Sequence, residues 1–193
     1  MSTLKILETV QLPTDHGHFI MSIISYGDDL EHIVLERSSN VSEIPIIRIH
    51  SECMTGDVFR SHRCDCGEQL EKSLKKIGQT GHGFVFYLRQ EGRGIGLLNK
   101  MKAYNLQEQG LDTAEANEKL GFDIDLREYD IVASFLKSKD VGHVKLITNN
   151  PEKCDALRDG GIEVDRIPLP TTTHNANERY KSTKMNKLGH YGH

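Results

Sequence analysis

The stretch HVKLITNNPEKCDALRDGGIEVDRIP, residues 143–168, holds the clearest sign of the fold. HVKLIT has the apolar, β-branched composition of a strand. Asn150 followed by Pro151 is typical of a helix N-cap and its first residue. Gly160 and Gly161 mark the end of that helix, and IEVDRIP has the composition of a second strand. The stretch therefore predicts a strand, a helix and another strand in succession.

Upstream of this stretch the same alternation continues. GFVFYL, residues 83–88, is apolar enough for a buried strand. Helical spacing predicts a helix after Cys66 that ends near Gly78 and Gly81, another after residue 96, a third from Asp112–Thr113 with Glu115 in a capping box, and a fourth over 131–136. The helix after Cys66 is predicted from Leu70, Leu74 and Ile77, and the helix after residue 96 from Leu97, Leu98, Met101 and Tyr104. The helix over 131–136 is predicted from Ile131, Val132, Phe135 and Leu136.

The first fifty residues read as short strands between turns. HFIMSII, HIVLER and IPIIRIH are strand-like, and turn residues at Gln11–Pro13, at 26–29 and at 38–40 separate them. A β-rich start followed by αβ units predicts a mixed α/β fold, with helices flanking a central mixed β-sheet. We expect one domain over residues 1–193, in which 171–193 is a polar tail, either mobile or ordered by a partner.

Composition limits the function classes. The 193 residues are 37% hydrophobic and carry a formal net charge of −4, with a mean hydropathy of −0.48 and a pI of about 6.2. This balance lacks the basic footprint of nucleic-acid or membrane-surface binding. The N-terminus has no apolar leader, and three of the four cysteines are clustered, as in proteins of a reducing compartment. We therefore expect a cytoplasmic protein with neither nucleic-acid nor membrane partners.

The cysteines are spaced as metal ligands. Cys53, Cys64 and Cys66, within SECMTGDVFRSHRCDCGEQ, offer three thiolates to a zinc ion, which takes four ligands. An open fourth position would hold water and indicate a catalytic site. Alternatively, His62 or Cys154 closes a structural site, although structural sites more often use two Cys-x2-Cys pairs.

Several charged residues could act beside such a metal. Thiolates donate strongly and acidify a metal-bound water less than imidazoles do, so we expect a general acid or base nearby. His50, Glu52 and Asp57 lie close to Cys53 in sequence, and Asp125 with Arg127 forms a charged pair further on. Each of these could equally be structural.

Two turns suit an anion. RQEGRGIG, residues 89–96, joins a strand to a helix and contains two arginines, and TNNPEK, residues 148–153, lies where a strand ends and a helix begins. The first could be only a tight connection. Lys153 has the wrong charge for the first turn of a helix, which either a bound phosphate or solvent would explain. Cys154 is expected to be a small buried hydrophobe.

Together these segments resemble GTP cyclohydrolase II, the enzyme of riboflavin synthesis that opens the guanine imidazole ring. The resemblance covers most of the chain, from about Arg48 to His190. It rests on RIHSEC, TGDVF, RCDCG, RQEGRGIGLLNK, the Asp125/Arg127 region after EANEKLGF, TNNPEK and NANERYKSTKMNKLGH.

The resemblance implies one zinc ion per chain on Cys53, Cys64 and Cys66, whose water attacks C8 of GTP. Formate and pyrophosphate leave, giving 2,5-diamino-6-(5-phospho-ribosylamino)pyrimidin-4-one. Magnesium accompanies the triphosphate, and the protein is a homodimer. The implied GTP-binding residues are Arg48, Ile49, His50, Ser51, Glu52, Gln69, Glu91, Gly92, Arg93, Thr113, Thr148 and Lys153.

The same resemblance implies three catalytic residues. Tyr104 assists near the ring-opening site, Asp125 accepts a proton, and Arg127 is the proposed nucleophile toward the α-phosphorus. A guanidinium with a pKa above about 12 is a poor nucleophile, so stabilisation of charge on the α-phosphate is the milder hypothesis for Arg127.

The chain departs from the family pattern at Arg60, His62 and Lys181, and lacks the dihydroxybutanone-phosphate synthase domain of some members, which predicts the monofunctional form. Two alternatives stay open. One is a related enzyme that stops at the formylated pyrimidine or at pyrophosphate release. The other is a zinc-stabilised GTP-binding regulator without turnover, which would need a closed metal site.

Overall fold

The computed structural model describes residues 3–27, 30–39, 43–123 and 125–172. The packing of the chain divides it into two compact units. Unit 1 comprises Met1–His50, Glu71–Arg89 and Glu128–Leu169, and unit 2 comprises Ser51–Leu70, Gln90–Arg127 and Pro170–His193. The expected GTP-binding residues are therefore distributed over both units. The prediction of a single domain over 1–193 stays a prediction.

A seven-stranded sheet forms the centre of unit 1, in the order β1-β2-β3-β5-β4-β6-β7. Its strands are β1 (Leu4–Thr14), β2 (Gly17–Tyr26), β3 (His32–Ser38), β4 (Ile46–Ser51), β5 (His82–Leu88), β6 (His143–Ile147) and β7 (Glu163–Ile167). The pairs β1/β2, β2/β3 and β3/β5 are antiparallel, whereas β4/β6 and β6/β7 are parallel. The predicted mixed α/β sheet is confirmed.

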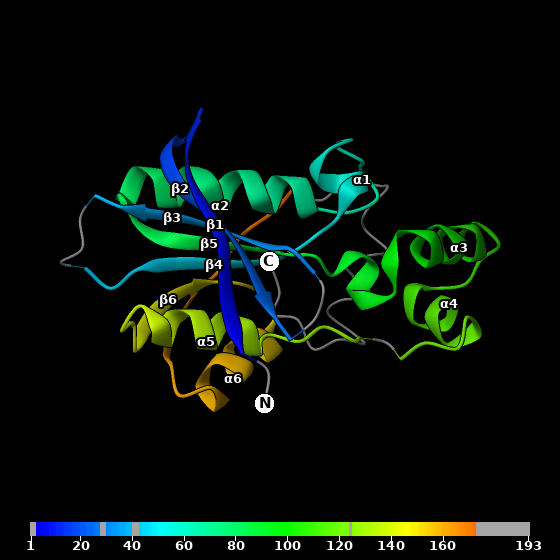
Figure 1. Ribbon diagram of the computed structural model, residues 1–193. Helices are drawn as coiled ribbons and strands as arrows, with labels where there is room; N and C mark the ends of the chain where they lie inside the picture. The colour runs from blue at the N-terminus through cyan, green and yellow to red at the C-terminus, as the bar shows by residue number, and fades with distance from the viewer. Residues whose placement is uncertain (1–2, 28–29, 40–42, 124, 173–193) are drawn as a thin grey trace. The chain divides into compact units, whose positions relative to one another are not determined.

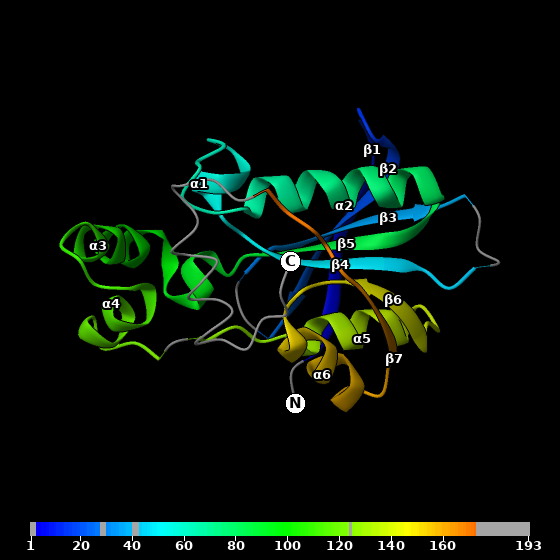
Figure 2. The same cartoon turned by 180° about the vertical axis from the view of Figure 1, so that it is seen from behind.

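Helices cover both faces of this sheet. In Figures 1 and 2, the body of α2 (Cys66–Thr80) lies along one face, and α5 (Asp130–Ser138) and α6 (Pro151–Asp159) lie along the other. The apolar face expected for residues 131–136 is confirmed, because Ile131, Val132, Phe135 and Leu136 are buried in the core. The Phe135 ring packs edge-on against Phe86, with ring centroids 5.4 Å apart.

Strand β5 contains the apolar run GFVFYL, which was predicted to be a buried strand. Five of its seven residues are buried, as expected for a strand covered on both faces. Gly83, at its start, has a φ of 153°. A Cβ at this position would lie 1.9 Å from the carbonyl oxygen of Ile46, so only glycine lets the two segments approach this closely.

Two local expectations are corrected. Gln11–Pro13 is not a turn, since it lies inside β1, where Pro13 pairs with His18 near the end of an edge strand. A proline is tolerated there because its missing N–H interrupts no interior ladder. Gly78 does not end α2. It lies within the helix, where a Cβ would be 2.0 Å from the carbonyl oxygen of His16, and Gly81 with a φ of 80° follows the helix end.

Unit 2 is built from short helices. They are α1 (Met54–Asp57), the first turn of α2, the 3-10 helix η1 (Glu91–Gly94), α3 (Gly96–Glu108) and α4 (Thr113–Lys119). The predicted capping box of α4 is confirmed: Glu115 N donates to Asp112 Oδ1 at 3.1 Å, and Asp112 N donates to Glu115 Oε2 at 2.7 Å. Among the described helices of the whole chain, none is both long and apolar enough to cross a membrane.

Candidate metal centre

The three predicted metal ligands come together in unit 2. The sulfur atoms of Cys53, Cys64 and Cys66 all lie within 4.8 Å of one another, and those of Cys53 and Cys64 are 3.6 Å apart. Tetrahedral coordination with Zn–S bonds of about 2.3 Å would place two sulfurs about 3.8 Å apart. The donor set and its spacing therefore fit a zinc ion.

Two glycines allow the cysteine-bearing segments to meet. A Cβ on Gly56 would lie 2.8 Å from Cys64 Sγ and 3.2 Å from Cys53 Sγ, inside the space of the thiols. A Cβ on Gly67 would lie 2.3 Å from the carbonyl oxygen of Gly56. Both belong to motifs noted in the sequence, TGDVF and RCDCG, and the structure explains why a side chain at either position would separate the ligands.

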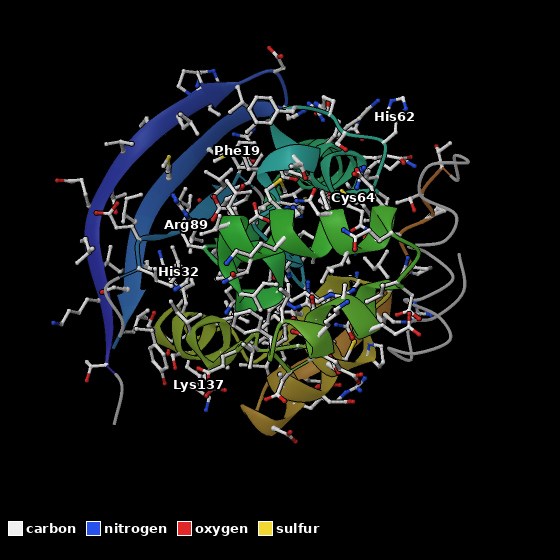
Figure 3. The ribbon with its side chains drawn as sticks, turned by 90° about the vertical axis from the view of Figure 1, so that its right-hand side faces the viewer. Phe19, His32, His62, Cys64, Arg89 and Lys137 are labelled. Carbon is white, nitrogen blue, oxygen red and sulfur yellow. The ribbon has the colours of Figure 1, made fainter. Side chains whose placement is uncertain are left out.

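Neither candidate fourth ligand joins the thiols. His62 is exposed, and Figure 3 shows it apart from Cys64. Cys154 is buried in the hydrophobic core of unit 1, as expected for a small hydrophobe. Among the described histidine, cysteine, aspartate and glutamate residues, the group close enough to hold a metal ion consists of the three thiols. This arrangement agrees with three protein ligands.

The three thiols differ in their pKa values. Hydrogen bonds from Cys64 and Cys66 hold the pKa of Cys53 far below its usual range, assisted by the charge of Lys100. The hydrogen bond to Cys53 raises the pKa of Cys64 to about 11, and the same cause raises that of Cys66. Without a metal, Cys53 is therefore the thiolate and its neighbours keep their protons, which zinc would displace on binding.

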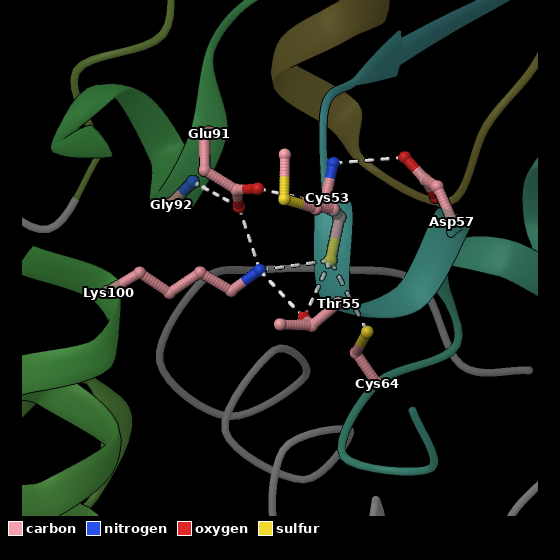
Figure 4. A network of polar contacts seen from close by, with 8 residues as sticks. Cys53, Thr55, Asp57, Cys64, Glu91, Gly92 and Lys100 are labelled. Carbon is pink, nitrogen blue, oxygen red and sulfur yellow. Dashed lines mark hydrogen bonds and ion pairs between the residues drawn. The ribbon is translucent and has the colours of Figure 1, made fainter. Parts of the chain in front are cut away.

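Lys100 is a buried cation beside the thiols that the sequence analysis did not single out. Figure 4 shows its ammonium between the Cys53 sulfur, the Thr55 hydroxyl and the Glu91 carboxylate. Glu91 also accepts a hydrogen bond from Met54 N at 2.7 Å, next to Cys53. The carboxylate of Glu91, a predicted GTP ligand, therefore supports the cysteine loop in two ways. It binds the backbone N–H of Met54, and it holds Lys100, which contacts Cys53.

Tyr104 lies beside this network on α3. Burial raises its pKa, against the opposing effects of the Lys100 charge and a hydrogen bond with Thr55. The guanidinium carbon of Arg63 lies 4.8 Å from the centre of the Tyr104 ring, and Arg63 is paired with Glu108. Tyr104 therefore stays a neutral phenol at physiological pH and can donate a proton.

Asp125 and Arg127, the other predicted catalytic residues, face each other. Arg127 Nε donates to Asp125 Oδ1 at 2.8 Å, and Nη2 pairs with Oδ2. The segment is tied to η1 by a hydrogen bond of 3.1 Å from Leu126 N to Arg93 O. Arg93 itself has a φ of 63°, and both of its terminal nitrogens are buried without a hydrogen-bond partner among the described residues.

The segment after Pro170 is held at the cysteine loop. Thr171 Oγ1 donates to Asp65 Oδ2 at 2.9 Å, and Thr172 N donates to Glu68 Oε2 at 3.0 Å. The predicted GTP ligand Gln69 donates to the same Asp65 oxygen at 2.8 Å. The rest of the predicted tail, 173–193, lies outside the described residues, as does the side chain of the predicted GTP ligand Thr113.

Near Cys53, the candidate base Asp57 has a structural contact. It accepts a hydrogen bond from Cys53 N at 3.0 Å, which ties the last residue of the short α1 helix to the residue before its start. Ser51 is half-buried, and its hydroxyl oxygen has no hydrogen-bond partner among the described side chains and backbone. Glu52 is half-buried, and Gly92 has a φ of 62° in η1.

The predicted GTP-binding residues of unit 1 are buried around the ends of β4 and β6. Their contacts are Arg48 Nη1 with Ile147 O at 3.1 Å, Lys153 Nζ with Ile49 O at 2.9 Å, Thr148 Oγ1 with Asn150 N at 3.0 Å, and the His50 ring stacked on Tyr87. Lys153 is 5% exposed and lies 5.6 Å from the Tyr129 ring centre, so a carbonyl and an aromatic ring surround it, rather than solvent.

Comparison with known proteins gives one family. A sequence profile described as GTP cyclohydrolase II matches residues 5–168. A GTP cyclohydrolase-2 of Shewanella amazonensis is 48% identical over 191 residues, covering 97% of this chain and 93% of the relative. A riboflavin biosynthesis protein RibBA of Bacillus cereus is 51% identical over 186 residues, covering 94% of this chain and 46% of the relative. The chain thus spans about half the length of the RibBA relatives it matches.

A solved structure shares the fold at low identity. The crystal structure of RibBX, a two-domain 3,4-dihydroxy-2-butanone 4-phosphate synthase from A. baumannii, matches with a TM-score of 0.51 and 16% identity. The match covers 87% of this chain and 40% of that one.

Proposed function

This chain belongs to the GTP cyclohydrolase II family, and from that membership we propose that it hydrolyses GTP as a step of riboflavin biosynthesis. The proposed reaction opens the guanine imidazole ring and releases formate and pyrophosphate, leaving a diaminopyrimidine ribotide. The names of the relatives, GTP cyclohydrolase-2 and riboflavin biosynthesis protein, support the reaction and its place. We further propose a cytoplasmic homodimer.

The observation that carries this proposal is the cluster of Cys53, Cys64 and Cys66 with Lys100 against it. Those three thiols would hold one zinc ion per chain. A bound zinc ion would supply Lewis acidity for the hydrolytic steps. Magnesium would accompany the triphosphate, because it binds phosphate oxygens while keeping several waters.

The protonation states of the proposed catalytic residues suit such a reaction. Tyr104, a neutral phenol, would donate a proton to a nitrogen of the opening ring. Asp125, ionised by its pairing with Arg127, would accept one. Arg127 would stabilise negative charge on the α-phosphate rather than attack it, since a charged guanidinium offers no lone pair of useful basicity.

Arg93 supports an anionic substrate. Buried polar atoms are nearly always hydrogen-bonded, yet both terminal nitrogens of Arg93 lack such a partner among the described residues. A triphosphate oxygen would supply the missing acceptor through a charge-assisted hydrogen bond. The other proposed GTP-binding residues are Arg48, Ile49, His50, Ser51, Glu52, Gln69, Glu91, Gly92, Thr113, Thr148 and Lys153.

The test is the product balance of the zinc-loaded protein with GTP and magnesium. One formate and one pyrophosphate for each GTP consumed, with a diaminopyrimidine product, would support the full reaction. Pyrophosphate without formate would replace it with the partial reaction, and a lack of both products would favour a GTP-binding regulator.

Two variants make the result specific to the metal centre. Cys64→Ser should lose both zinc and turnover. His62→Ala changes an exposed neighbour and should keep one zinc per chain, whereas loss of zinc from this variant would show that His62 is a ligand.

A further inference from the structure

Lys100 is held in one position beside the metal ligands. Its side chain is buried, with the residue 8% exposed, and its ammonium donates to three acceptors: Cys53 Sγ at 3.1 Å, Thr55 Oγ1 at 3.0 Å and Glu91 Oε1 at 2.7 Å. An ammonium has three N–H donors. All three are therefore in use, and the charge is fixed against the sulfur.

Glu91 fixes this lysine from the opposite side. Its carboxylate accepts hydrogen bonds from Lys100, from Met54 N at 2.7 Å and from Gly92 N at 2.9 Å. Because Met54 follows Cys53, the same carboxylate positions the ligand-bearing loop and the lysine that contacts its sulfur. Figure 4 shows the Lys100 ammonium between the Glu91 carboxylate and the Cys53 sulfur.

The charge of Lys100 matters because the ligand set is anionic. Three thiolates around a divalent cation leave a formal charge of −1 at a site where two of the three cysteines are buried, and each thiolate donates electron density to the metal. A charged N–H donor on one sulfur withdraws part of that density. The contact therefore opposes the loss of Lewis acidity that three thiolates impose.

We propose that Lys100 is a positioning residue that fixes the Cys53 sulfur and weakens its electron donation to the metal, so that a three-thiolate site stays electrophilic. This inference rests on the proposed zinc centre. The competing interpretation is an ion pair with Glu91 that only stabilises unit 2. The two interpretations differ in whether removal of the ammonium changes the metal–sulfur bond.

Cobalt substitution reports on that bond. Cobalt(II) in a thiolate site has near-ultraviolet sulfur-to-metal charge-transfer bands, and removal of a hydrogen bond raises the energy of the sulfur lone pairs. We therefore expect Lys100→Met to shift this band to longer wavelength. Its zinc affinity in chelator competition should nevertheless fall by about 10- to 100-fold, because the Cys53 sulfur is no longer held in place and no cation offsets the negative charge of the three thiolates.

Two further variants complete the comparison. Lys100→Arg keeps a charged donor and should restore the band toward its original position. Lys102→Met removes an exposed lysine from the same helix and should behave as the unmodified protein. If Lys100→Met fails to fold because Glu91 is left buried and unpaired, the double variant Lys100→Met/Glu91→Gln removes that charge as well and is measured instead.

The outcomes separate this inference from the proposed function. If the unmodified protein and Lys102→Met bind neither cobalt nor zinc, the metal centre is wrong and the inference fails with it. If both bind metal, and Lys100→Met has the same charge-transfer band and zinc affinity as Lys102→Met, only the role of Lys100 is overturned. A shifted band together with weaker zinc binding supports it.

Discussion

The pairing of Asp125 with Arg127 limits what either side chain can do in a reaction. Burial on its own would raise the pKa of Asp125, but the hydrogen bonds and charge of Arg127 outweigh it and hold the pKa below its usual value, with a smaller effect from Arg93. Asp125 is therefore ionised at neutral pH. Arg127 keeps its proton, since its charge is stabilised by the carboxylate it contacts.

We expect Arg127→Gln to raise the pKa of Asp125, because burial then acts without its opposing partner. A carboxyl group with a depressed pKa stabilises the folded state above its unfolded pKa, and this stabilisation is lost as pH falls through the folded pKa. The variant should therefore be less stable at neutral pH by about 1–3 kcal/mol, and this deficit should shrink as pH falls, because the unmodified protein then loses the stabilisation that its depressed Asp125 pKa provides. Carboxyl carbon NMR titration and chemical unfolding measure the two effects.

The conservative variant Arg127→Lys serves as the control. It keeps a cation and should retain part of the pKa depression, although it cannot form both parallel hydrogen bonds. An Asp125 pKa that is the same in the glutamine variant as in the unmodified protein would show that Arg127 is not what lowers it.

At the same scale, the sequence predicted the thiols but not the lysine beside them. Cys53, Cys64 and Cys66 stand out by residue type and spacing alone. Lys100 was not predicted to be buried, because Leu97, Leu98, Met101 and Tyr104 suggested a different buried face of its helix. The buried residues of α3 are instead Lys100 and Ala103, and Leu98 is 69% exposed. Which helix face is buried depends here on the thiol cluster, a tertiary feature that helical periodicity does not contain.

At the scale of elements, local chemistry predicted the helix ends best. Asn150 caps α6 by accepting a hydrogen bond from Glu152 N at 3.0 Å, with Pro151 as the first helical residue. Strand β1 was harder to predict, because its residues are mostly exposed and Pro13 resembles a turn signal. Pairing with β2 forms that strand, and such pairing is not visible in a single segment.

Helices α5 and α6 end in the same motif with different residues. In α5, Val141 N donates to Leu136 O at 2.9 Å and Asp140 N to Lys137 O at 3.1 Å; in α6, Ile162 N donates to Leu157 O at 3.0 Å and Gly161 N to Arg158 O at 2.8 Å. Both are Schellman motifs. The left-handed position is Asp140 in one, with a φ of 55°, and Gly161 in the other, with a φ of 78°.

Exchanging these residue types should change stability in opposite directions. We expect Asp140→Gly to raise the free energy of unfolding by about 0.5 kcal/mol, because glycine removes the left-handed strain, partly offset by its freedom in the unfolded chain. Gly161→Ala should lower it by about 1–2 kcal/mol. Its Cβ would lie 3.7 Å from Lys137 atoms, an ordinary contact, so backbone strain is the cause.

Urea unfolding of the two variants beside the unmodified protein measures both effects. Because the hydrogen bonds of the two motifs are alike, each variant serves as the control for the other. Equal changes of the same sign in both proteins would contradict the role assigned to the left-handed residue.

At the scale of the whole molecule, the two units differ in what stabilises them. The hydrophobic core cluster lies entirely in unit 1. In the described part of unit 2, the buried apolar side chains are small apart from one isoleucine: Cys53, Cys64, Ile95, Ala103 and Ala116. Apolar burial scales with area, so unit 2 gains much less from it. Composition could not reveal this division, because segments of the two units alternate along the chain.

Removal of the proposed zinc ion should therefore loosen unit 2 and leave the sheet intact. A ligand that binds only the folded form adds about 2.7 kcal/mol of stability at 100 times its dissociation constant. Its removal should lower amide protection in unit 2 by up to about 100-fold. Hydrogen exchange read by mass spectrometry, with and without a chelator, should show faster exchange in residues 54–70 and 90–123 and unchanged exchange in β5 and β6.

Cys64→Ser provides the control for this experiment. Without a complete ligand set, it should resemble the chelated protein from the start and respond to neither chelator nor added zinc. Faster exchange throughout both units would show that they unfold together, and unchanged exchange in unit 2 would show that the thiol cluster contributes nothing to its stability. When zinc is restored to the unmodified protein, amide protection in unit 2 should recover. This recovery would link the stability of unit 2 to the metal ion, because the small apolar core of unit 2 buries too little area to stabilise it alone.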